Sequence, residues 1–236
     1  MAARSPVGRL AECAGNFAVC GQHRARRSGR SAPTVSNSAA LTGQPIGHYL
    51  DALAAGTAAP GGGSAAALAG AMAAALLEMA CNLTANRPRF AAHHPEIVAA
   101  RTGATRLRQE LTGLAQLDSE AYGAVLAAYR LPKTTPQQKE ARRAALVAAQ
   151  ENATQTQLRV ATACATLLNV ARDVVNIINP NTQGDVFAAL RLAEAGLQTA
   201  ANNVSINLKL RPLKSSARAK TMRAQLNDLL PGQISE

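Results

Sequence analysis

The chain has 236 residues, enough for one ordinary domain with a sizeable core. Alanine is its commonest residue, at 53 positions, against three tyrosines, three phenylalanines and no tryptophan. This mixture favours helices packed through small side chains and disfavours a β-sandwich. The formal net charge of +11 predicts attraction to anions, and the shortage of aromatic residues favours a small anionic molecule over nucleic acid.

Cysteine spacing and hydropathy indicate a reducing, aqueous compartment, which we expect to be the cytoplasm. The four cysteines are Cys13, Cys20, Cys81 and Cys164. They include no C-x-x-C pair, so we expect neither a disulfide framework nor a zinc site. The longest uncharged stretch, residues 52–77, is broken at Pro60 and is mostly alanine, so we predict no membrane helix.

Residues 1–40 differ from the rest of the chain. They hold six arginines and one acidic residue, and they have no hydrophobic periodicity. An organelle transit peptide has this composition. We favour a disordered tail or a misassigned start, with translation beginning near Val35 or Leu41. The folded domain is then expected over residues 41–236.

From residue 44 onward the spacing is helical, and no strand pattern is found. The expected helices cover residues 45–55, 65–85, 95–129, 136–178 (long enough to be kinked or split) and 185–208, with a further short helix near 217–230. The fold class is therefore all-α, a bundle of five to six helices.

The expected helix 65–85 has two distinct faces. Ser64 precedes it as a candidate N-cap. Larger apolar residues recur along one face, which we expect to point into the core: Leu68, Met72, Leu76, Met79 and Leu83. The other face is so rich in alanine that a second backbone can approach it closely.

Asp118 is the clearest candidate for chemistry. In the expected helix 95–129, Leu107, Leu111 and Leu114 are followed by Ala121 at helical spacing, and Asp118 completes this frame. Burying a lone carboxylate is costly, so such a placement needs a reason. Desolvation would raise its pKa and suit it to general acid–base catalysis. A structural aspartate paired with an arginine, or one capping a neighbouring helix, is the alternative.

A glycine-rich loop, Pro60-Gly61-Gly62-Gly63-Ser64, precedes the helix 65–85. Backbone N–H groups at a helix N-terminus can bind an anion. The loop lacks the lysine of a P-loop, and no strand precedes it. A plain helix-initiating loop is therefore the favoured interpretation of the loop taken by itself.

Four other polar residues are weak signals by themselves. Lys133 lies in the turn after the expected helix 95–129, and Asp185 lies at the start of the last core helix. Asn181 lies in the loop before that helix, while Asn203 lies inside it, where asparagine is unfavourable unless its amide is used. No histidine is placed with a serine or cysteine as a catalytic triad needs, and we expect no metal site.

Taken together, these segments resemble the cyclodeaminase/cyclohydrolase family. The matching segments, in chain order, are Tyr49-Leu-Asp51, Pro60-Gly-Gly-Gly-Ser64, Asn82-Leu-Thr84, Asp118-Ser-Glu-Ala-Tyr122, Leu131-Pro-Lys133, Asn181 with Asp185, and Asn203-Val-x-Ile-Asn207. They extend over about residues 44–210. The glycine–serine element is specific, and the others are individually weak but collinear.

The resemblance implies an all-helical homodimer that acts on a one-carbon derivative of tetrahydrofolate without a cofactor. One such reaction hydrolyses 5,10-methenyltetrahydrofolate to 10-formyltetrahydrofolate. The other closes 5-formiminotetrahydrofolate with release of ammonia. The absence of a formiminotransferase domain from this sequence favours the cyclohydrolase. Neither a nucleic acid nor a membrane is an expected partner.

The resemblance also implies roles for single residues. Asp118 would be the general acid–base residue, Lys133 would bind a carboxylate or adjust the pKa of Asp118, and Asp185 would hold the pterin or assist proton transfer. Asn181 and Asn203 would supply hydrogen bonds. Residues 60–64 would cradle the folate through backbone N–H groups, and the basic surplus, including Arg87 and Arg89, would suit a polyglutamate tail.

One departure supports an alternative from another class. Gly184 stands where the family has serine, so a hydroxyl group is missing beside Asp185. A non-catalytic helical folate-binding module is consistent with that loss. The presence of Asp118, Lys133 and Asp185 argues against it.

Overall fold

The computed structural model describes residues 41–230, and within them it contains helices and no strand. The α-helices are α1 (Ile46–Ala54), α2 (Gly62–Ala85), α3 (His94–Arg130), α4 (Pro136–Val174), α5 (Gln183–Asn207) and α6 (Ala217–Leu229). Short 3-10 helices cover Leu41–Gly43, Pro88–His93, Pro180–Thr182 and Leu213–Ser215. The all-α prediction is confirmed, and the prediction for residues 1–40 lies outside the described residues.

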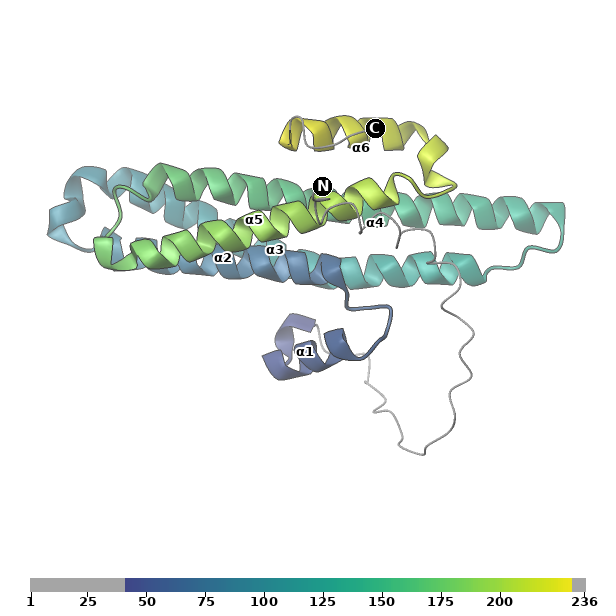
Figure 1. The fold of residues 1–236 in the computed structure, drawn as a ribbon, viewed down its shortest axis with the longest axis horizontal. Helices are drawn as coiled ribbons and strands as arrows, with labels where there is room; N and C mark the ends of the chain where they lie inside the picture. Colours follow the sequence, from purple (N-terminus) through teal and green to yellow (C-terminus); the bar gives the residue numbers. More distant parts are fainter. Residues whose placement is uncertain (1–40, 231–236) are drawn as a thin grey trace, which may run out of the picture. The chain divides into compact units, whose positions relative to one another are not determined.

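Helices α2 to α5 form an antiparallel four-helix bundle (Figure 1). Both α2 and α4 pack against α3 and α5, so α2 and α4 lie on opposite corners. Helix α6 packs on α4 and α5, where Met222 and Leu226 join a second apolar cluster with Val204 and Leu208. The expected helix 136–178 is one continuous helix, α4, of 39 residues, which ends at Val174 rather than at residue 178.

The start of α4 follows from its local sequence. Thr135 is the N-cap, and its hydroxyl accepts the backbone N–H of Gln138 at 3.2 Å. The Gln138 side chain in turn accepts the backbone N–H of Thr135, which completes a capping box. Pro136 occupies the first turn, where its missing N–H costs nothing.

The predicted orientation of α2 is wrong in part, because only Leu68 and Leu76 of the predicted stripe pack, half-buried, against the core. Met72, Met79 and Leu83 are 48%, 38% and 47% exposed, whereas the alanine- and glycine-rich face points into the core. The face with small side chains points inward because it lets the backbones of α2 and α5 approach closely. A Cβ on Gly196 of α5 would lie 2.9 Å from the carbonyl oxygen of Ala66. Larger side chains on this face would push α5 away from α2.

The predicted frames of α3 and α5 agree better with the structure. Leu107, Leu111 and Leu114 are buried, and Asp118, the next position of the frame, is half-buried. Tyr129 is exposed because α3 extends beyond the start of α2 at that point. In α5, Leu190 is half-buried and the other members of the predicted stripe are fully buried: Val186, Ala193, Leu197, Ala200, Val204 and Leu208.

Of the helices in residues 41–230, α2 alone has the length and hydropathy to cross a membrane, and 56% of its apolar window is buried in the bundle. The bundle uses this helix as a core element, between α3 and α5. Its low polarity has a structural reason in that position.

Candidate active site

Asp118, on α3, contacts α4 and the N-terminal end of α2. Nε2 of Gln157, on α4, donates a hydrogen bond to Oδ1 of Asp118 at 2.6 Å. The backbone N–H of Ser64, in the first turn of α2, donates a second hydrogen bond to the carboxylate. Among residues 41–230 no ion pair involves Asp118, so two neutral donors hold it.

Burial raises the pKa of Asp118 above its ordinary value of 3.8, and this effect exceeds the two hydrogen bonds that lower it. Desolvation disfavours the ionised form, while the Gln157 and Ser64 donors favour it. General acid–base catalysis needs a group that can both take up and release a proton, and a raised pKa suits a carboxyl group to that task.

The glycines before α2 bring its N-terminus against this carboxylate. Helix α2 begins at Gly62, three residues earlier than predicted, so Gly61 rather than the predicted Ser64 is its N-cap. A Cβ on Gly63 would lie 2.7 Å from Cγ of Asp118 and would also collide with the Gln157 amide. Glycine is required there for space. The positive end of the helix dipole therefore faces Asp118.

This contact alters the predicted role of residues 60–64. The Ser64 N–H, predicted to bind the folate, donates to Asp118 instead. The Ser64 hydroxyl lies 3.2 Å from the buried Tyr49 hydroxyl of α1, which joins α1 to this end of the bundle. Pro60 is buried, Gly61 is half-buried and Gly62 is exposed.

Behind Asp118, a pair of amides extends across the bundle. Gln157 is 2% exposed, and its Oε1 accepts a hydrogen bond from Nδ2 of Asn203, on α5, at 3.2 Å. The expectation that something uses the Asn203 amide inside its helix is confirmed. The partner of this amide is the Gln157 side chain.

The other predicted residues lie elsewhere in the chain. Lys133 is exposed in the turn between α3 and α4, and α3 alone carries the chain about 18 Å beyond Asp118. Asp185 lies in the first turn of α5, about 27 Å along that helix from Asn203. A single chain therefore does not bring Asp118, Lys133 and Asp185 together.

Asn181 belongs to a separate polar cluster at the other end of α2. Its centre is Asn179, which is 1% exposed and whose Oδ1 accepts from Nη2 of Arg89 at 3.0 Å and from the Asn181 N–H at 3.2 Å. The Asn179 N–H donates to Oγ1 of Thr84 at 3.1 Å. Arg89, predicted to meet a polyglutamate tail, is thus tied to this loop.

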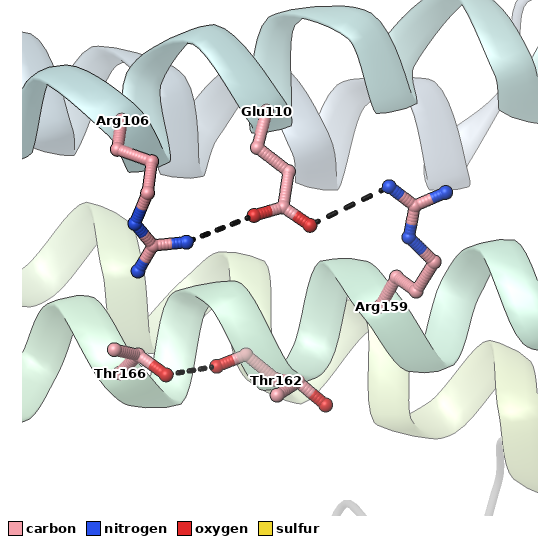
Figure 2. A network of polar contacts seen from close by, with 5 residues as sticks. All are labelled: Arg106, Glu110, Arg159, Thr162 and Thr166. Atoms are coloured by element: carbon pink, nitrogen blue, oxygen red, sulfur yellow. Dashed lines mark hydrogen bonds and ion pairs between the residues drawn. The ribbon is translucent and has the colours of Figure 1, made fainter.

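A pocket of about 480 Å³ lies away from Asp118, where α3 and α4 meet α6. In it, Glu110 lies between Arg106 and Arg159, with both N–O distances at 3.5 Å (Figure 2). Asp228 of α6 also lines the pocket. The two guanidinium groups and two carboxylates balance, so the pocket has no net charge with which to select an anion.

Residues 45–228 match the family model described as formiminotransferase-cyclodeaminase. The chain belongs to this family. It is 37% identical over 187 residues to a methenyltetrahydrofolate cyclohydrolase of Methylorubrum extorquens, covering 79% of this chain and 89% of that protein.

Two further members of the family are similar to this chain. A formimidoyltransferase-cyclodeaminase of Sus scrofa is 30% identical over 200 residues, which span 84% of this chain but 36% of that longer protein. The crystal structure of a formiminotetrahydrofolate cyclodeaminase from Thermotoga maritima superposes with a TM-score of 0.63 at 25% identity, covering 80% of this chain and 96% of that one. The relatives of this chain are enzymes, and the predicted family and fold are confirmed.

In this family member, sequence reasoning missed Gln157. The spacing of Gln150, Gln157, Ala161, Cys164 and Leu168 places both glutamines on the core face of α4. A long helix with many polar residues hides that signal, because an internal glutamine looks like a surface one until the phase of the helix is known.

Neither Cys81 nor Cys164, the cysteines within residues 41–230, is suited to act as a nucleophile. Burial raises the pKa of Cys81 to about 11 and that of Cys164 to about 12, so both are protonated at neutral pH. Between residues 41 and 230, no group of three His, Cys, Asp or Glu side chains is placed to hold a metal ion.

Proposed function

We propose that this chain hydrolyses 5,10-methenyltetrahydrofolate to 10-formyltetrahydrofolate, with Asp118 as the general acid–base residue. The observation that carries the proposal is the half-buried Asp118 carboxylate, held by two neutral donors at the N-terminus of α2. The Methylorubrum extorquens relative, which this chain matches over most of both lengths, supports the choice of reaction.

One carboxyl group can exchange protons with the attacking water and with N5 in this reaction. A water molecule attacks the methenyl carbon between N5 and N10, and ionised Asp118 takes the proton that the water loses. The tetrahedral adduct then collapses by cleavage of its bond to N5. Protonated Asp118 returns its proton to N5 as the C–N5 bond breaks. The hydroxyl group of the adduct loses its own proton to solvent as the C=O bond forms, and the formyl group remains on N10.

Cyclodeamination is the second candidate, and the Thermotoga maritima and Sus scrofa proteins favour it. There, N10 attacks the formimino carbon of 5-formiminotetrahydrofolate, and the tetrahedral carbon expels ammonia. Asp118 would protonate the departing nitrogen after taking the proton from N10. Both reactions pass through a tetrahedral carbon between nitrogens, so the same carboxyl group serves either.

The test follows methenyltetrahydrofolate absorbance with the purified full chain, after subtraction of the spontaneous rate. Decay above that rate supports the cyclohydrolase. Appearance of the same absorbance, with ammonia, from 5-formiminotetrahydrofolate supports the cyclodeaminase instead. Activity in neither assay would contradict both and favour the non-catalytic folate-binding module.

The working unit of the proposal is a homodimer. The outward face of α2, formed by Met72, Met79 and Leu83, is a row of exposed apolar side chains on a core helix. Burial of such a face stabilises an association between copies. A second copy is also the means by which Lys133 or Asp185 would act beside an Asp118.

The remaining partner assignments rest on charge. Residues 41–236 carry 19 basic and 13 acidic residues, a balance that favours a polyglutamylated folate over the monoglutamate. Added salt should therefore raise the KM for a polyglutamylated substrate more than that for the monoglutamate. We also propose a cytoplasmic location, without nucleic-acid or membrane partners. Cell fractionation and a DNA-binding titration test these assignments.

A further inference from the structure

The two amides behind Asp118 have a defined direction. An ionised carboxylate only accepts hydrogen bonds, so Gln157 must present its NH₂ group to Oδ1 of Asp118, which it does at 2.6 Å. Oε1 of Gln157 then faces α5. Asn203 must present its own NH₂ group to that oxygen, and this bond measures 3.2 Å. Asn203 thereby selects the orientation of Gln157 that suits an ionised Asp118.

Burial makes this orientation hard to reverse. Gln157 is 2% exposed, so water does not take the place of either partner. Gly63 lies directly above the amide, where even a Cβ atom would collide with Nε2. Turning the Gln157 amide over would set its oxygen against the carboxylate and its NH₂ group against the NH₂ group of Asn203.

We propose that Gln157, oriented by Asn203, is a positioning residue that fixes the Asp118 carboxyl group and favours its ionised form. This inference rests on the proposed acid–base role of Asp118. Because Oδ1 accepts the Gln157 bond, the Asp118 carboxyl group is held in one orientation. Asn203 acts through Gln157, at one further remove from the substrate.

The groups around Asp118 make the Gln157 hydrogen bond one of the main determinants of the Asp118 protonation state. Facing the carboxylate are the Ser64 N–H from α2 and the Gln157 amide from α4, with the Tyr49 hydroxyl of α1 behind Ser64 and the Asn203 amide of α5 behind Gln157. The two groups that bond directly to the carboxylate, a backbone N–H and a side-chain amide, carry no charge. Loss of the Gln157 bond therefore leaves burial opposed by one donor.

The experiment titrates Asp118 in the full chain by carbon-13 NMR of its carboxyl group, without substrate, using Asp118→Asn to assign the signal. Gln157→Met keeps the volume of the side chain and removes its hydrogen bonds. It should move the pKa of Asp118 upward by on the order of one unit, because one charge-assisted bond is lost. Asn203→Leu should move it in the same direction by less, since Gln157 remains but is free to turn.

A double variant separates a relay from two independent effects. If Asn203 acts through Gln157, adding Asn203→Leu to Gln157→Met changes the pKa no further. Gln155→Met is the matched control, because Gln155 is on the same helix and lines the distant pocket. It should leave the pKa of Asp118 and the rate unchanged. Should Gln157→Met fail to fold, Gln157→Glu replaces it and must also raise the pKa, by charge repulsion.

Kinetics supply the second readout. In Gln157→Met the limb of the rate–pH profile that belongs to Asp118 should move to higher pH, with kcat lowered and KM for the folate nearly unchanged. An Asp118 pKa equal to that of the wild type, or fully additive shifts in the double variant, would overturn the inference. A wild-type chain that turns over neither folate, while its Asp118 titration still depends on Gln157, would sink the proposed function alone.

Discussion

The position of Asp118 exposes its pKa to two opposite effects. Burial favours the protonated carboxyl group, whereas the hydrogen bonds from Gln157 and from the N-terminus of α2 favour the ionised carboxylate. A group under such opposed effects changes its protonation state for a small free-energy difference. At the residue scale, this balance is the physical reason to place the acid–base chemistry at Asp118.

Asp118→Asn tests that role most directly. The amide keeps the volume of the side chain but cannot take up or release a proton. General acid–base catalysis contributes about 100-fold to 10,000-fold, so kcat should fall by at least about 100-fold. The absorbance assay measures the rate, and circular dichroism checks that the variant is folded. An unchanged kcat would remove Asp118 from the mechanism.

The raised pKa of Asp118 also predicts how stability changes with pH. Between its ordinary value of 3.8 and its raised folded value, the folded chain binds more protons at this site than the unfolded chain does. The contribution of Asp118 to the free energy of unfolding is therefore fully present below 3.8 and is lost as the pH rises through the folded pKa.

Urea unfolding of the wild type and Asp118→Asn across that pH range measures this contribution. The stability of the wild type relative to the variant should decline with rising pH, because the variant has no titrating group there. A difference that stays constant, or grows, as the pH rises would contradict the raised pKa.

At the scale of the element, α2 and α5 show how small residues determine a helix contact. Gly196 brings α5 against the α2 backbone, and Gly70 of α2 faces the Sγ atom of Cys164, which a Cβ there would approach to 2.7 Å. Close packing of this kind leaves no room for a methyl group. The glycines are required for space, since neither has a positive φ.

Gly196→Ala should therefore destabilise the fold by about 1–3 kcal/mol, the usual cost of overpacking a core. Gly113→Ala on α3 is the matched control, because nothing lies within 4 Å of its added Cβ. Helix propensity should make that variant more stable by about 0.5–1 kcal/mol. Denaturant unfolding of both variants checks the prediction, and equal effects of the same sign would show that space is not the cause.

At the scale of the whole molecule, the bundle spreads the predicted site residues along its length. Asp118, on α3, lies beside the start of α2. Asp185, in the first turn of α5, follows the loop whose Asn179 bonds to Thr84 near the end of α2. Lys133 is in the α3–α4 turn. A monomer can use Asp118 with residues 60–64, but it cannot add the other two. The proposed second copy is thus a requirement of the full predicted site.

A charge on the outward face of α2 should separate the copies. Met79→Lys places an ammonium group in the proposed interface, where its desolvation opposes association. Sedimentation should show a dimer for the wild type and a monomer for this variant, which should stay folded because Met79 is outside the core. Ala144→Lys, at an exposed position of α4, is the control and should remain dimeric. A monomeric wild type would contradict the proposal.

Several features of the molecule followed from the sequence alone. The cap at Thr135-Pro136 located the start of α4, and the spacing from Val186 to Leu208 located the buried face of α5. The glycine–serine element and Asp118 identified the family. Such signals are local, because a cap, a helical period or a motif depends on residues close together in the chain.

The tertiary structure decided the features that depend on contact between distant segments. It turned α2 by its small face toward α5, since backbone approach at Gly196 outweighs the burial of Met72 and Met79. It placed Gln157 against Asp118, 39 positions away in the chain. It also separated Lys133 and Asp185 from Asp118. Each of these contacts stabilises a pair of helices, so the sequence of one helix by itself does not reveal it.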